Sequence, residues 1–496
     1  MAFKSEKTLM AVFIIVLITR LIFAFQTPYF SDDESYYELR QIEHIKKTGL
    51  PIVNDELSYG GRTRLSTPIY SYIIAGITYI FPSIYAVKFV VNLFGSVIVF
   101  AAYLLAYQLS RNKRVSNLTA LVSGFLPIYF RETVNSLNSY PFFIPAILFF
   151  IYYFINLHRK NLNKILALLF LIVLGSPSGF LLILGLILYI VFCYLEKIKL
   201  DRAEIEVIFF SLFFFLWVDF IIYKKAFTTH GIQIIWQNIP KTILDNYFIT
   251  IGVFEIISVV GIIPIICGIF VIYQYLFKKK SQQVYLIVAL TSSGFILFWF
   301  KLVPLILALI FLGAMLTLLS SLFFKELFIY IKKTKIANVE TIVMYGLIVI
   351  VLLTMMTPSL VYAYGKIINV PGQPTIDALT WIKHNTDQNT TVLLPYTQGN
   401  LISYFAHRKN VIDSDFILIT DASVRLNETR IIYTTHFKID AIRLINKYKI
   451  DYIIFNNAVK QLYNIGTLRY ATPDCFELIY NTSVQIYRPL CELDKK

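Results

Sequence analysis

Long runs of hydrophobic residues alternate with short polar segments along most of the chain. Many runs approach the roughly 20 apolar residues that an α-helix needs to cross the hydrocarbon core of a bilayer. We therefore predict a polytopic α-helical membrane protein. The composition agrees, because 57% of the 496 residues are hydrophobic and 15% are charged, against about 45–50% and about 25% in soluble domains. A soluble enzyme, a disordered chain and a disulfide scaffold are thereby excluded.

Eleven transmembrane helices account for these runs. A Gly-Ser-Pro-Ser-Gly turn at 175–179 divides the long run 165–195 into two helices. The run 68–82 is too short to cross, and we expect it to lie as a helix at the membrane interface. The remaining predicted spans are 8–25, 85–110, 115–130, 140–157, 204–223, 251–277, 284–300, 305–324 and 341–357.

The charges of the loops predict the orientation. The net charge is +15, and Lys and Arg are concentrated in alternate loops, beginning with Lys4 and Lys7 before the first span. Since basic loops stay on the cytoplasmic side, we expect a cell-membrane protein with a cytoplasmic N-terminus. The loops 26–67, 131–139 and 224–250 then lie outside. Loop charge explains the basicity, so we expect no nucleic-acid partner.

The composition changes near residue 371, after a transmembrane domain that covers 1–358. Candidate strands at 392–394, 411–412 and 452–455 alternate with amphipathic helices, which predicts a small α/β domain over 371–496 on the extracytoplasmic side. Cys475 and Cys491 fall in this domain. They are either bonded, which an extracytoplasmic location would allow, or two free thiols.

Ionisable side chains occur in the predicted spans, in each case in the outer third. A proton-driven transporter would place such groups near the bilayer midplane, so the pattern indicates a polar zone at the outer mouth. Snorkelling of individual side chains to the interface is the alternative interpretation. The residues are Arg20, Lys88, Asp219 and Glu255, with Lys301 just past a helix end.

Three consecutive carboxylates open the first outer loop, at Asp32, Asp33 and Glu34. A carboxylate at the membrane surface can serve as general base for an acceptor hydroxyl of a lipid-borne substrate. A neighbouring carboxylate can orient it or bind a metal. The alternative is an acidic N-cap that starts a helix at Ser35.

The same loop resembles the start of the GT-C superfamily of integral-membrane glycosyltransferases. The resemblance rests on Asp33-Glu34-Ser35-Tyr36-Tyr37, Arg40, Gly49 and Thr67-Pro68-Ile69-Tyr70. The pattern is that of the protein O-mannosyltransferase and aminoarabinose-transferase branch, where an Asp-Glu-x-x-Tyr motif opens this loop. A His and a second Pro of that branch are missing near Pro68. Lys88 and Lys301-Leu-Val-Pro304 stand where the family often has Arg.

The C-terminal domain is similar to a different branch, the catalytic subunits of oligosaccharyltransferases. Gly399 and Arg408 match the region of the Trp-Trp-Asp-Tyr-Gly motif and its downstream Arg. Pro395, Tyr396 and Thr397 stand where the family has Trp-Trp-Asp, which reads the acceptor sequon. This departure argues against an oligosaccharyltransferase. An ordinary loop and helix at 399–408 is the alternative interpretation.

The resemblance implies an inverting glycosyltransferase that takes a sugar from a polyprenyl-phosphate-linked donor at the outer membrane face. By the motif, Asp33 would be the general base for the acceptor hydroxyl of a lipid, protein or glycan, and Glu34 would orient Asp33 or a bound water. A divalent metal, Mg or Mn, stays open, with Glu132 as a candidate ligand, although the metal-free branch fits the first motif better. The implied substrate-binding residues are Asp32, Tyr37, Arg62, Arg64, Lys88, Arg131, Asn135 and Lys301.

Two other functions fit the same topology. A lipid or glycan flippase would suit eleven spans, but the sequence lacks an inverted repeat between its halves and charges near the midplane. A non-catalytic scaffold with an outer binding domain would not explain why three carboxylates, Asp32, Asp33 and Glu34, are clustered at the end of the first span. The glycosyltransferase is therefore the main hypothesis.

Overall fold

The computed structural model describes residues 2–176, 179–244, 252–333 and 340–492. The chain folds as two units. The helical unit comprises Met1–Pro28, Thr67–Ile222 and Tyr247–Ile368, and the mixed unit comprises Tyr29–Ser66, Tyr223–Asn246 and Asn369–Lys496. The mixed unit therefore unites two loop segments with the C-terminal region, whereas the sequence suggests one boundary near 358–371.

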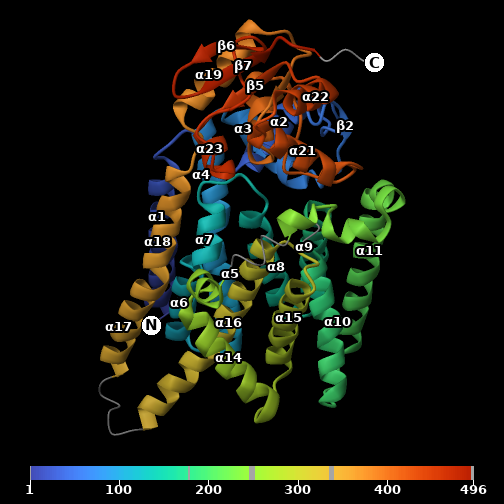
Figure 1. Ribbon diagram of the computed structural model, residues 1–496. Helices are drawn as coiled ribbons and strands as arrows, with labels where there is room; N and C mark the ends of the chain where they lie inside the picture. Colours follow the sequence, from blue (N-terminus) through green and yellow to red (C-terminus); the bar gives the residue numbers. More distant parts are fainter. Residues whose placement is uncertain (1, 177–178, 245–251, 334–339, 493–496) are drawn as a thin grey trace. The chain divides into compact units, whose positions relative to one another are not determined.

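The helical unit contains long helices that run side by side (Figure 1). Neighbouring pairs such as α10 with α15 and α14 with α16 pack along their length. The helices are α1 (Ala2–Ala24), α3 (Ile69–Ile80), α4 (Ile84–Ser96), α5 (Ile98–Ser110), α6 (Lys113–Gly124), α7 (Pro127–Thr133), α8 (Tyr140–Ile155), α9 (Leu162–Gly175), α10 (Gly179–Leu195), α11 (Arg202–His230), α13 (Val253–Val260), α14 (Ile262–Phe277), α15 (Gln282–Trp299), α16 (Leu305–Lys333), α17 (Glu340–Val351) and α18 (Thr357–Ile368).

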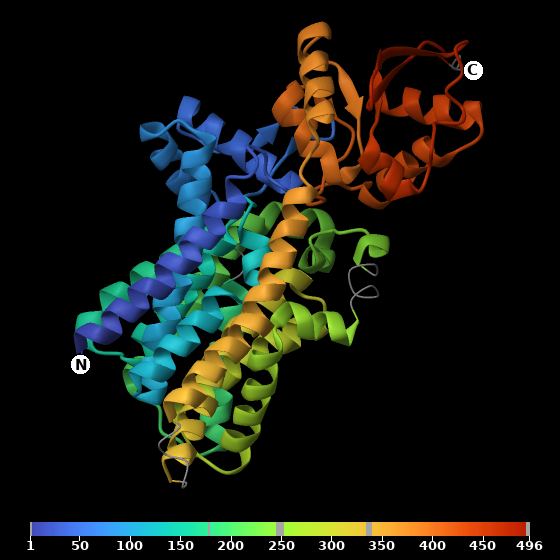
Figure 2. The same cartoon turned by 90° about the vertical axis from the view of Figure 1, so that its left-hand side faces the viewer.

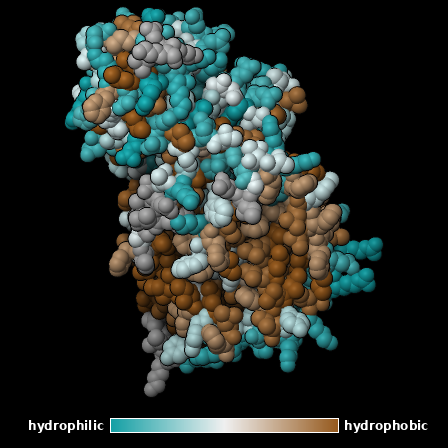
Figure 3. All heavy atoms as spheres, turned by 45° about the vertical axis from the view of Figure 1, so that its right-hand side comes forward, coloured by the Kyte–Doolittle hydropathy of each residue, from teal (hydrophilic) through white to brown (hydrophobic). Residues whose placement is uncertain are grey.

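Among the described residues, six helices are long and apolar enough to cross a membrane, or up to seven if a bent pair counts as one span. Three shorter apolar helices cover Ile69–Ile80, Tyr140–Ile155 and Gly179–Leu195. Hydrophobic side chains dominate the visible surface of the helical unit (Figure 3), as expected of helices that face lipid. The chain is thus a helical membrane protein, while eleven crossings stay a prediction.

Proline and glycine interrupt two of the predicted helices. The run 115–130 forms α6 and α7, which are separate because Pro127, in the first turn of α7, has no N–H to continue a helix. The pair α13 and α14 meets at 94° at Gly261, whose φ of 95° favours glycine. The run 165–195 forms α9 and α10, which confirms two helices there. Residues 177–178 of that turn lie outside the described residues.

The mixed unit is built on a five-stranded sheet in the order β4-β3-β5-β7-β6. The strand β3 pairs in parallel with β4 and β5, while β7 runs antiparallel to both β5 and β6. The C-terminal strands are drawn in red in Figure 2. The predicted mixture of strands and helices is confirmed, although the strand expected at 411–412 lies slightly earlier. The strands are β3 (Thr391–Leu393), β4 (Lys409–Asn410), β5 (Tyr452–Phe455), β6 (Phe476–Asn481) and β7 (Gln485–Pro489).

Helices and a disulfide complete this unit. Tyr433 on α21 (Ala422–Thr434) donates its hydroxyl to the carbonyls of Leu393 and Ile454, at 3.1 Å each, and so fastens that helix to two strands. Cys475 and Cys491 are bonded, and they close the open end of the β6–β7 hairpin. The other helices are α2 (Asp33–Thr48), α19 (Gln373–Asn385), α20 (Gly399–Leu401) with the π-helical turn η6 (Ile402–Ala406), α22 (Lys438–Tyr448) and α23 (Asn457–Tyr463).

All three segments of the mixed unit share one small core. The amide of Asn238 donates to the carbonyls of Phe416 and Ile419, at 2.9 and 2.6 Å, and so ties the middle segment to the C-terminal one. Burial of apolar side chains from each segment makes the association favourable. The clustered residues are Tyr59, Ile243, Ile412, Phe416, Ile419 and Ala422.

Candidate active site

The acidic run begins helix α2. Asp32 is its N-cap residue, and Asp33 and Glu34 lie in its first turn, where carboxylates interact favourably with the helix dipole. The helix begins at Asp33, two residues before the predicted start at Ser35. The interpretation of the acidic run as the beginning of a helix is therefore confirmed, although the first residue differs. Such a placement does not by itself exclude a chemical role.

Asp33 is held by the start of another helix of the mixed unit. Its Oδ1 accepts the N–H of Leu401 at 3.0 Å, and its Oδ2 accepts the backbone and side-chain N–H groups of Asn400 at 3.1 and 2.9 Å. The first N–H groups of a helix have no partner within it, so the carboxylate serves the N-terminus of α20. These three bonds fix the orientation of Asp33.

Burial raises the pKa of Asp33 from its ordinary value to about 7. The N–H donors of Asn400 and Leu401 act in the opposite direction because they stabilise the carboxylate, while the charge of Asp413 raises the pKa further. A carboxyl group with a pKa near neutrality can both hold and release a proton at working pH. Asp33 is therefore suited in acidity, as well as in orientation, to act as a base.

Glu34 keeps a solvent-exposed side chain, although the protein around it crowds out much of its hydration. That desolvation raises the pKa of Glu34, and the negative charges of Glu38 and Asp32 add to the effect. The remaining contact with water moderates this rise, because solvent screens the charges. Glu34 is thus the more accessible of the two adjacent carboxylates.

Two arginines of the first loop bind two aspartates of the C-terminal segment. Arg62 Nη2 lies 3.1 Å from Asp413 Oδ1 and 3.2 Å from Asp415 Oδ2. Arg64 Nε donates to Asp415 Oδ2 at 3.0 Å. The side chains of Arg62 and Asp413 are 4% and 0% exposed, so this pair is out of water, whereas Asp415 is 22% exposed. The spacing Arg-x-Arg matches the spacing Asp-x-Asp.

Asp55 extends this charge network toward α2. Its Oδ2 accepts from Arg64 Nη1 at 3.2 Å and also from Arg40. Arg64 lies over the ring of Tyr37, 3.5 Å from its centroid. The sequence assigns Arg62 and Arg64 to substrate binding, whereas in the structure carboxylates of the protein engage both. We name the six residues, Arg40, Asp55, Arg62, Arg64, Asp413 and Asp415, the loop clamp.

The two residues that match the oligosaccharyltransferase region have structural tasks here. Gly399 lies against the backbone of Ile412 and Asp413. Arg408 is 5% exposed, and it donates to the carbonyls of Lys383 and Thr386 at the end of α19. A cation at a helix C-terminus satisfies its free carbonyls. These contacts agree with the interpretation of 399–408 as a loop and helix of the domain.

Gly399→Ala should destabilise the mixed unit by about 1–3 kcal/mol, the range for forcing atoms into a packed site. The added Cβ would lie against the carbonyl oxygen of Ile412 and 2.7 Å from the Cβ of Asp413. Thermal unfolding of the purified protein measures the effect. Gly466→Ala is the control, since a Cβ there meets nothing within 4 Å. Equal melting temperatures for the two variants would contradict the argument.

Lys88 and Asn135 meet in the helical unit. Lys88 Nζ donates to Asn135 Oδ1 at 2.6 Å and to the carbonyls of Ala24 and Thr27 at 2.9 and 2.7 Å. Lys88 therefore joins α4 to the end of α1 and to the segment 131–139. The side chain is 0% exposed, so it does not snorkel to a surface. Arg20 is likewise buried, and it is not among the predicted site residues.

Arg131 and Glu132 also meet, but as an ion pair. Glu132 Oε1 accepts from Arg131 Nε, and Glu132 Oε2 lies 3.1 Å from Lys366 Nζ. Both oxygens thus face cations, which does not fit a metal ligand. Within the described ranges, no three His, Cys, Asp or Glu side chains are grouped to hold a metal ion. Glu132 instead connects α7 to α18.

Lys301 lies in the turn between α15 and α16, with a φ of 56°. Its backbone N–H donates to the carbonyl of Phe298 at 3.0 Å, which closes the end of α15. The structure thus groups the predicted site residues in separate sets. Asp32, Asp33, Glu34, Tyr37, Arg62 and Arg64 belong to the mixed unit, and Lys88, Arg131, Glu132, Asn135 and Lys301 belong to the helical unit.

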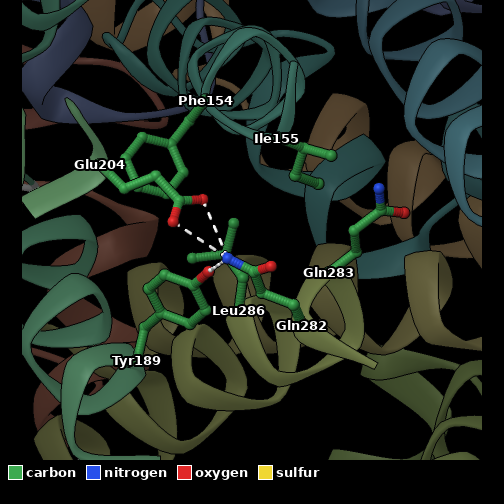
Figure 4. Close-up of a pocket in the computed structure, with 7 residues that line it drawn as sticks. All are labelled: Phe154, Ile155, Tyr189, Glu204, Gln282, Gln283 and Leu286. Atoms are coloured by element: carbon green, nitrogen blue, oxygen red, sulfur yellow. Dashed lines mark hydrogen bonds between the residues drawn. The ribbon is translucent and has the colours of Figure 1, made fainter. Parts of the chain in front are cut away.

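A small cavity lies among α8, α10, α11 and α15 (Figure 4). The Gln282 amide donates to both oxygens of Glu204, at 3.1 and 3.0 Å, and to the hydroxyl of Tyr189 at 2.9 Å. Phe154 and Leu286 supply apolar walls. Because its polar groups bond one another, we interpret this cavity as a helix contact. None of the predicted site residues lines it.

The sequence matches no protein-family model and no curated protein. Solved structures do match. The Archaeoglobus fulgidus oligosaccharyltransferase in complex with Zn and sulfate has a TM-score of 0.63 at 14% identity, over 89% of this chain and 67% of that chain. The same enzyme with an inhibitory peptide and a dolichol-phosphate gives 0.62 at 14% identity, over 90% and 69%.

ArnT from Cupriavidus metallidurans bound to undecaprenyl phosphate is also similar, with a TM-score of 0.52 at 10% identity. The match covers 98% of this chain and 98% of that chain. This chain therefore has the fold of GT-C glycosyltransferases over nearly its whole length, as the first-loop motif indicated. At these identities the likeness establishes the fold, and activity requires a separate argument.

Proposed function

We propose that this protein is an inverting glycosyltransferase that moves a sugar from a polyprenyl-phosphate-linked donor to an acceptor hydroxyl. The observation that carries the proposal is the fold match to ArnT over 98% of both chains, in a structure bound to undecaprenyl phosphate. The oligosaccharyltransferase that shares the fold also has a structure with a dolichol-phosphate. Both relatives thus bind the class of lipid that we assign to this chain.

Asp33 is the general base in this proposal. Its carboxylate is oriented by Asn400 and Leu401, and its pKa of about 7 lets it take a proton near neutral pH. As the hydroxyl oxygen attacks the anomeric carbon, its proton passes to Asp33 and the bond to the lipid phosphate breaks. The lipid phosphate leaves as an anion, and attack opposite the leaving group inverts the configuration. Glu34 orients Asp33 or a bound water molecule.

Cations of the helical unit receive the phosphate. We assign this task to Lys88, Arg131 and Lys301, with Asn135 as a hydrogen-bonding partner, because positive charge stabilises a departing phosphate. To donate to a phosphate oxygen, Lys88 would exchange one of the three oxygens that its Nζ bonds in the structure. We assign Arg62 and Arg64 to holding the first loop, since Asp413 and Asp415 engage them. No step of this mechanism passes through a metal.

The proposed topology has eleven crossings, a cytoplasmic N-terminus and an extracytoplasmic mixed unit. The disulfide between Cys475 and Cys491 supports an extracytoplasmic location of the mixed unit, because disulfides persist in oxidising compartments. The free cysteines of the described residues, Cys193 and Cys267, are buried in the helical unit. The reaction would then take place at the outer face of the cell membrane.

Proteoliposomes separate this function from lipid transport. The purified protein is supplied with a panel of polyprenyl-phosphate sugars and candidate acceptors, and released polyprenyl phosphate and the anomeric configuration of the product are measured. The proposal expects release together with a product of inverted configuration. Movement of the sugar-lipid across the bilayer with its sugar bond intact would instead indicate a flippase.

The rate and the stability should depend on pH in opposite directions. Turnover should rise between pH 6 and pH 8, because a base with a pKa of about 7 must lose its proton to act. A carboxyl whose folded pKa is raised stabilises the fold fully below its unfolded pKa of roughly 4. This contribution is lost as pH rises through 7. Initial rates and melting temperatures from pH 5.5 to 8.5 measure both trends, and a flat rate profile would contradict the assignment.

A further inference from the structure

Arg20, on α1, is enclosed within the helical unit. The side chain is 0% exposed. Its Nε donates to Asn92 Oδ1 at 3.1 Å and its Nη2 donates to Thr133 Oγ1 at 2.5 Å. The guanidinium carbon also lies 5.6 Å from the ring centroid of Tyr129 and 5.1 Å from that of Phe130. Arg20 therefore connects α1 with α4 and α7.

The cage around Arg20 is shaped for a guanidinium. A Cβ added at Gly95 would lie 2.5 Å from Arg20 Nη2, so a larger residue at that position would require the guanidinium to shift. Neutral oxygens and aromatic faces are the partners of Arg20 among the described residues, and its Nη1 atom has no hydrogen-bond partner there. A buried arginine inside a membrane helix costs free energy, and a methionine could fill the same space more cheaply. This cost points to a task beyond packing.

The contacts of Arg20 belong to a ladder on the segment 133–135. Arg20 holds Thr133. The Asn92 amide donates to the carbonyl of Val134 at 3.0 Å, and Lys88 Nζ donates to Asn135 Oδ1 at 2.6 Å. Three consecutive residues of the segment are thus each bonded by one polar side chain of α1 or α4. Lys88 and Asn92 are four residues apart, which places them on one face of α4.

Asn92 connects Arg20 to the backbone of Lys88. While its Oδ1 accepts from Arg20, its Nδ2 donates to the backbone carbonyl of Lys88 at 2.8 Å. The orientation of the Asn92 amide is determined by these contacts, because reversal would place an N–H group against the Arg20 guanidinium and an oxygen against two carbonyls. A change at Arg20 would therefore remove one partner of Asn92, whose amide bonds the backbone of Lys88 and of Val134, the residue before Asn135.

We propose that Arg20 is a positioning residue that holds Lys88 and Asn135 in place to receive the phosphate of the polyprenyl-phosphate donor. The inference rests on the proposed function, because that function assigns Lys88 and Asn135 to the phosphate. Arg20 acts through Asn92 and Thr133. Its loss should thus weaken donor binding in protein that is still folded.

Binding of undecaprenyl phosphate to the full-length protein in detergent tests this inference. Arg20→Met should weaken binding by roughly tenfold or more, by analogy with the loss of a group that orients a metal ligand. Arg20→Lys, which keeps the charge and one hydrogen bond, should recover part of the affinity. Thr19→Ala is the matched control on α1, because the Thr19 side chain is partly exposed and its hydroxyl bonds the carbonyl of Ile15 in its own helix. It should bind as the wild type does.

A purely structural Arg20 gives a different result. Arg20→Met would then melt at a lower temperature, while the folded protein would bind undecaprenyl phosphate with wild-type affinity, and that result overturns the inference. If Arg20→Met does not fold, Asn92→Ala interrupts the same ladder with Arg20 in place and should show the same loss. Wild-type protein that binds no undecaprenyl phosphate would contradict the proposed donor itself, and this outcome is visible before any variant is measured.

Discussion

Replacing Asp33 with asparagine should lower turnover by about 10²–10⁴-fold, the usual contribution of a well-placed base. Asparagine has nearly the same shape but cannot take the proton of the acceptor hydroxyl. Donor binding should be retained, because the phosphate contacts are assigned to residues of the helical unit. The measurement is the initial rate of sugar transfer, together with the affinity for undecaprenyl phosphate.

Asp33→Asn also disturbs the hydrogen bonds of Asp33 with Asn400 and Leu401. The loss of these bonds must be distinguished from the loss of the base. The introduced amide would keep one acceptor oxygen but turn an NH₂ group toward a backbone N–H of Asn400 or Leu401. Asn400→Ala serves as the comparison, since it removes one donor and leaves the carboxylate and both backbone donors. If both variants lose turnover in proportion to their loss of melting temperature, Asp33 is an anchor and not the base.

Two further variants complete this series. Asp377→Asn makes the same chemical change at an exposed position of the mixed unit, and it should leave the rate unchanged. Glu34→Gln removes the accessible carboxylate, and it should lower the rate by less than Asp33→Asn does. A larger loss for Glu34→Gln would reassign the base to Glu34.

Breaking the loop clamp should cost about 3–5 kcal/mol of folding free energy, because removal of one partner leaves a buried charge uncompensated. Asp413→Asn is the sharpest test. Its side chain is 0% exposed, and although burial alone would raise the pKa of Asp413, Arg62 and Arg64 more than offset this and hold it below its ordinary value. The variant should melt at a lower temperature, and proteases should cut the first loop more readily.

Asp440→Asn is the control for the loop clamp. It removes an ion pair with Arg443 in the same unit, but these side chains are 42% and 67% exposed, and such pairs contribute about 0–1 kcal/mol. The double variant Arg62→Met with Asp413→Leu should recover part of the loss, since it removes both charges. If the double variant loses as much folding free energy as Arg62→Met and Asp413→Leu lose together when each is made alone, charge pairing is not the cause of the destabilisation.

Helices and turns could be predicted from the sequence where a single local property, such as a long apolar run or a Gly and Pro cluster, determines the structure. Apolar length predicted the long helices, and Gly and Pro predicted the division at 175–179. The strands β6 and β7 were missed, because only part of each strand is buried and the alternation of apolar and polar residues is correspondingly weak. The helix α21 was missed for a similar reason, as its buried positions are few and scattered.

The candidate site was predicted in part. The motif predicted a role for Asp33 and Glu34, and the position of these residues directly after the first span is visible in the sequence. The partners of Asp33 could not be predicted, because Asn400 and Leu401 lie 367 and 368 residues away. Arg20 is recognisable in the sequence as an ionisable residue in a predicted span, yet only its contacts with Asn92 and Thr133 place it beside the segment that Lys88 bonds.

Composition and periodicity by themselves determined that this is a helical membrane protein with a small α/β region, since burial in lipid and packing of amphipathic elements depend on local sequence. The Asp-Glu-x-x-Tyr motif determined the superfamily expectation. Only the tertiary structure decided that Arg62 and Arg64 bind aspartates of the C-terminal segment, that Glu132 faces two cations, and that three segments share one unit. Charges find partners through space, and a sequence does not specify which of several opposite charges will be nearest once the chain has folded.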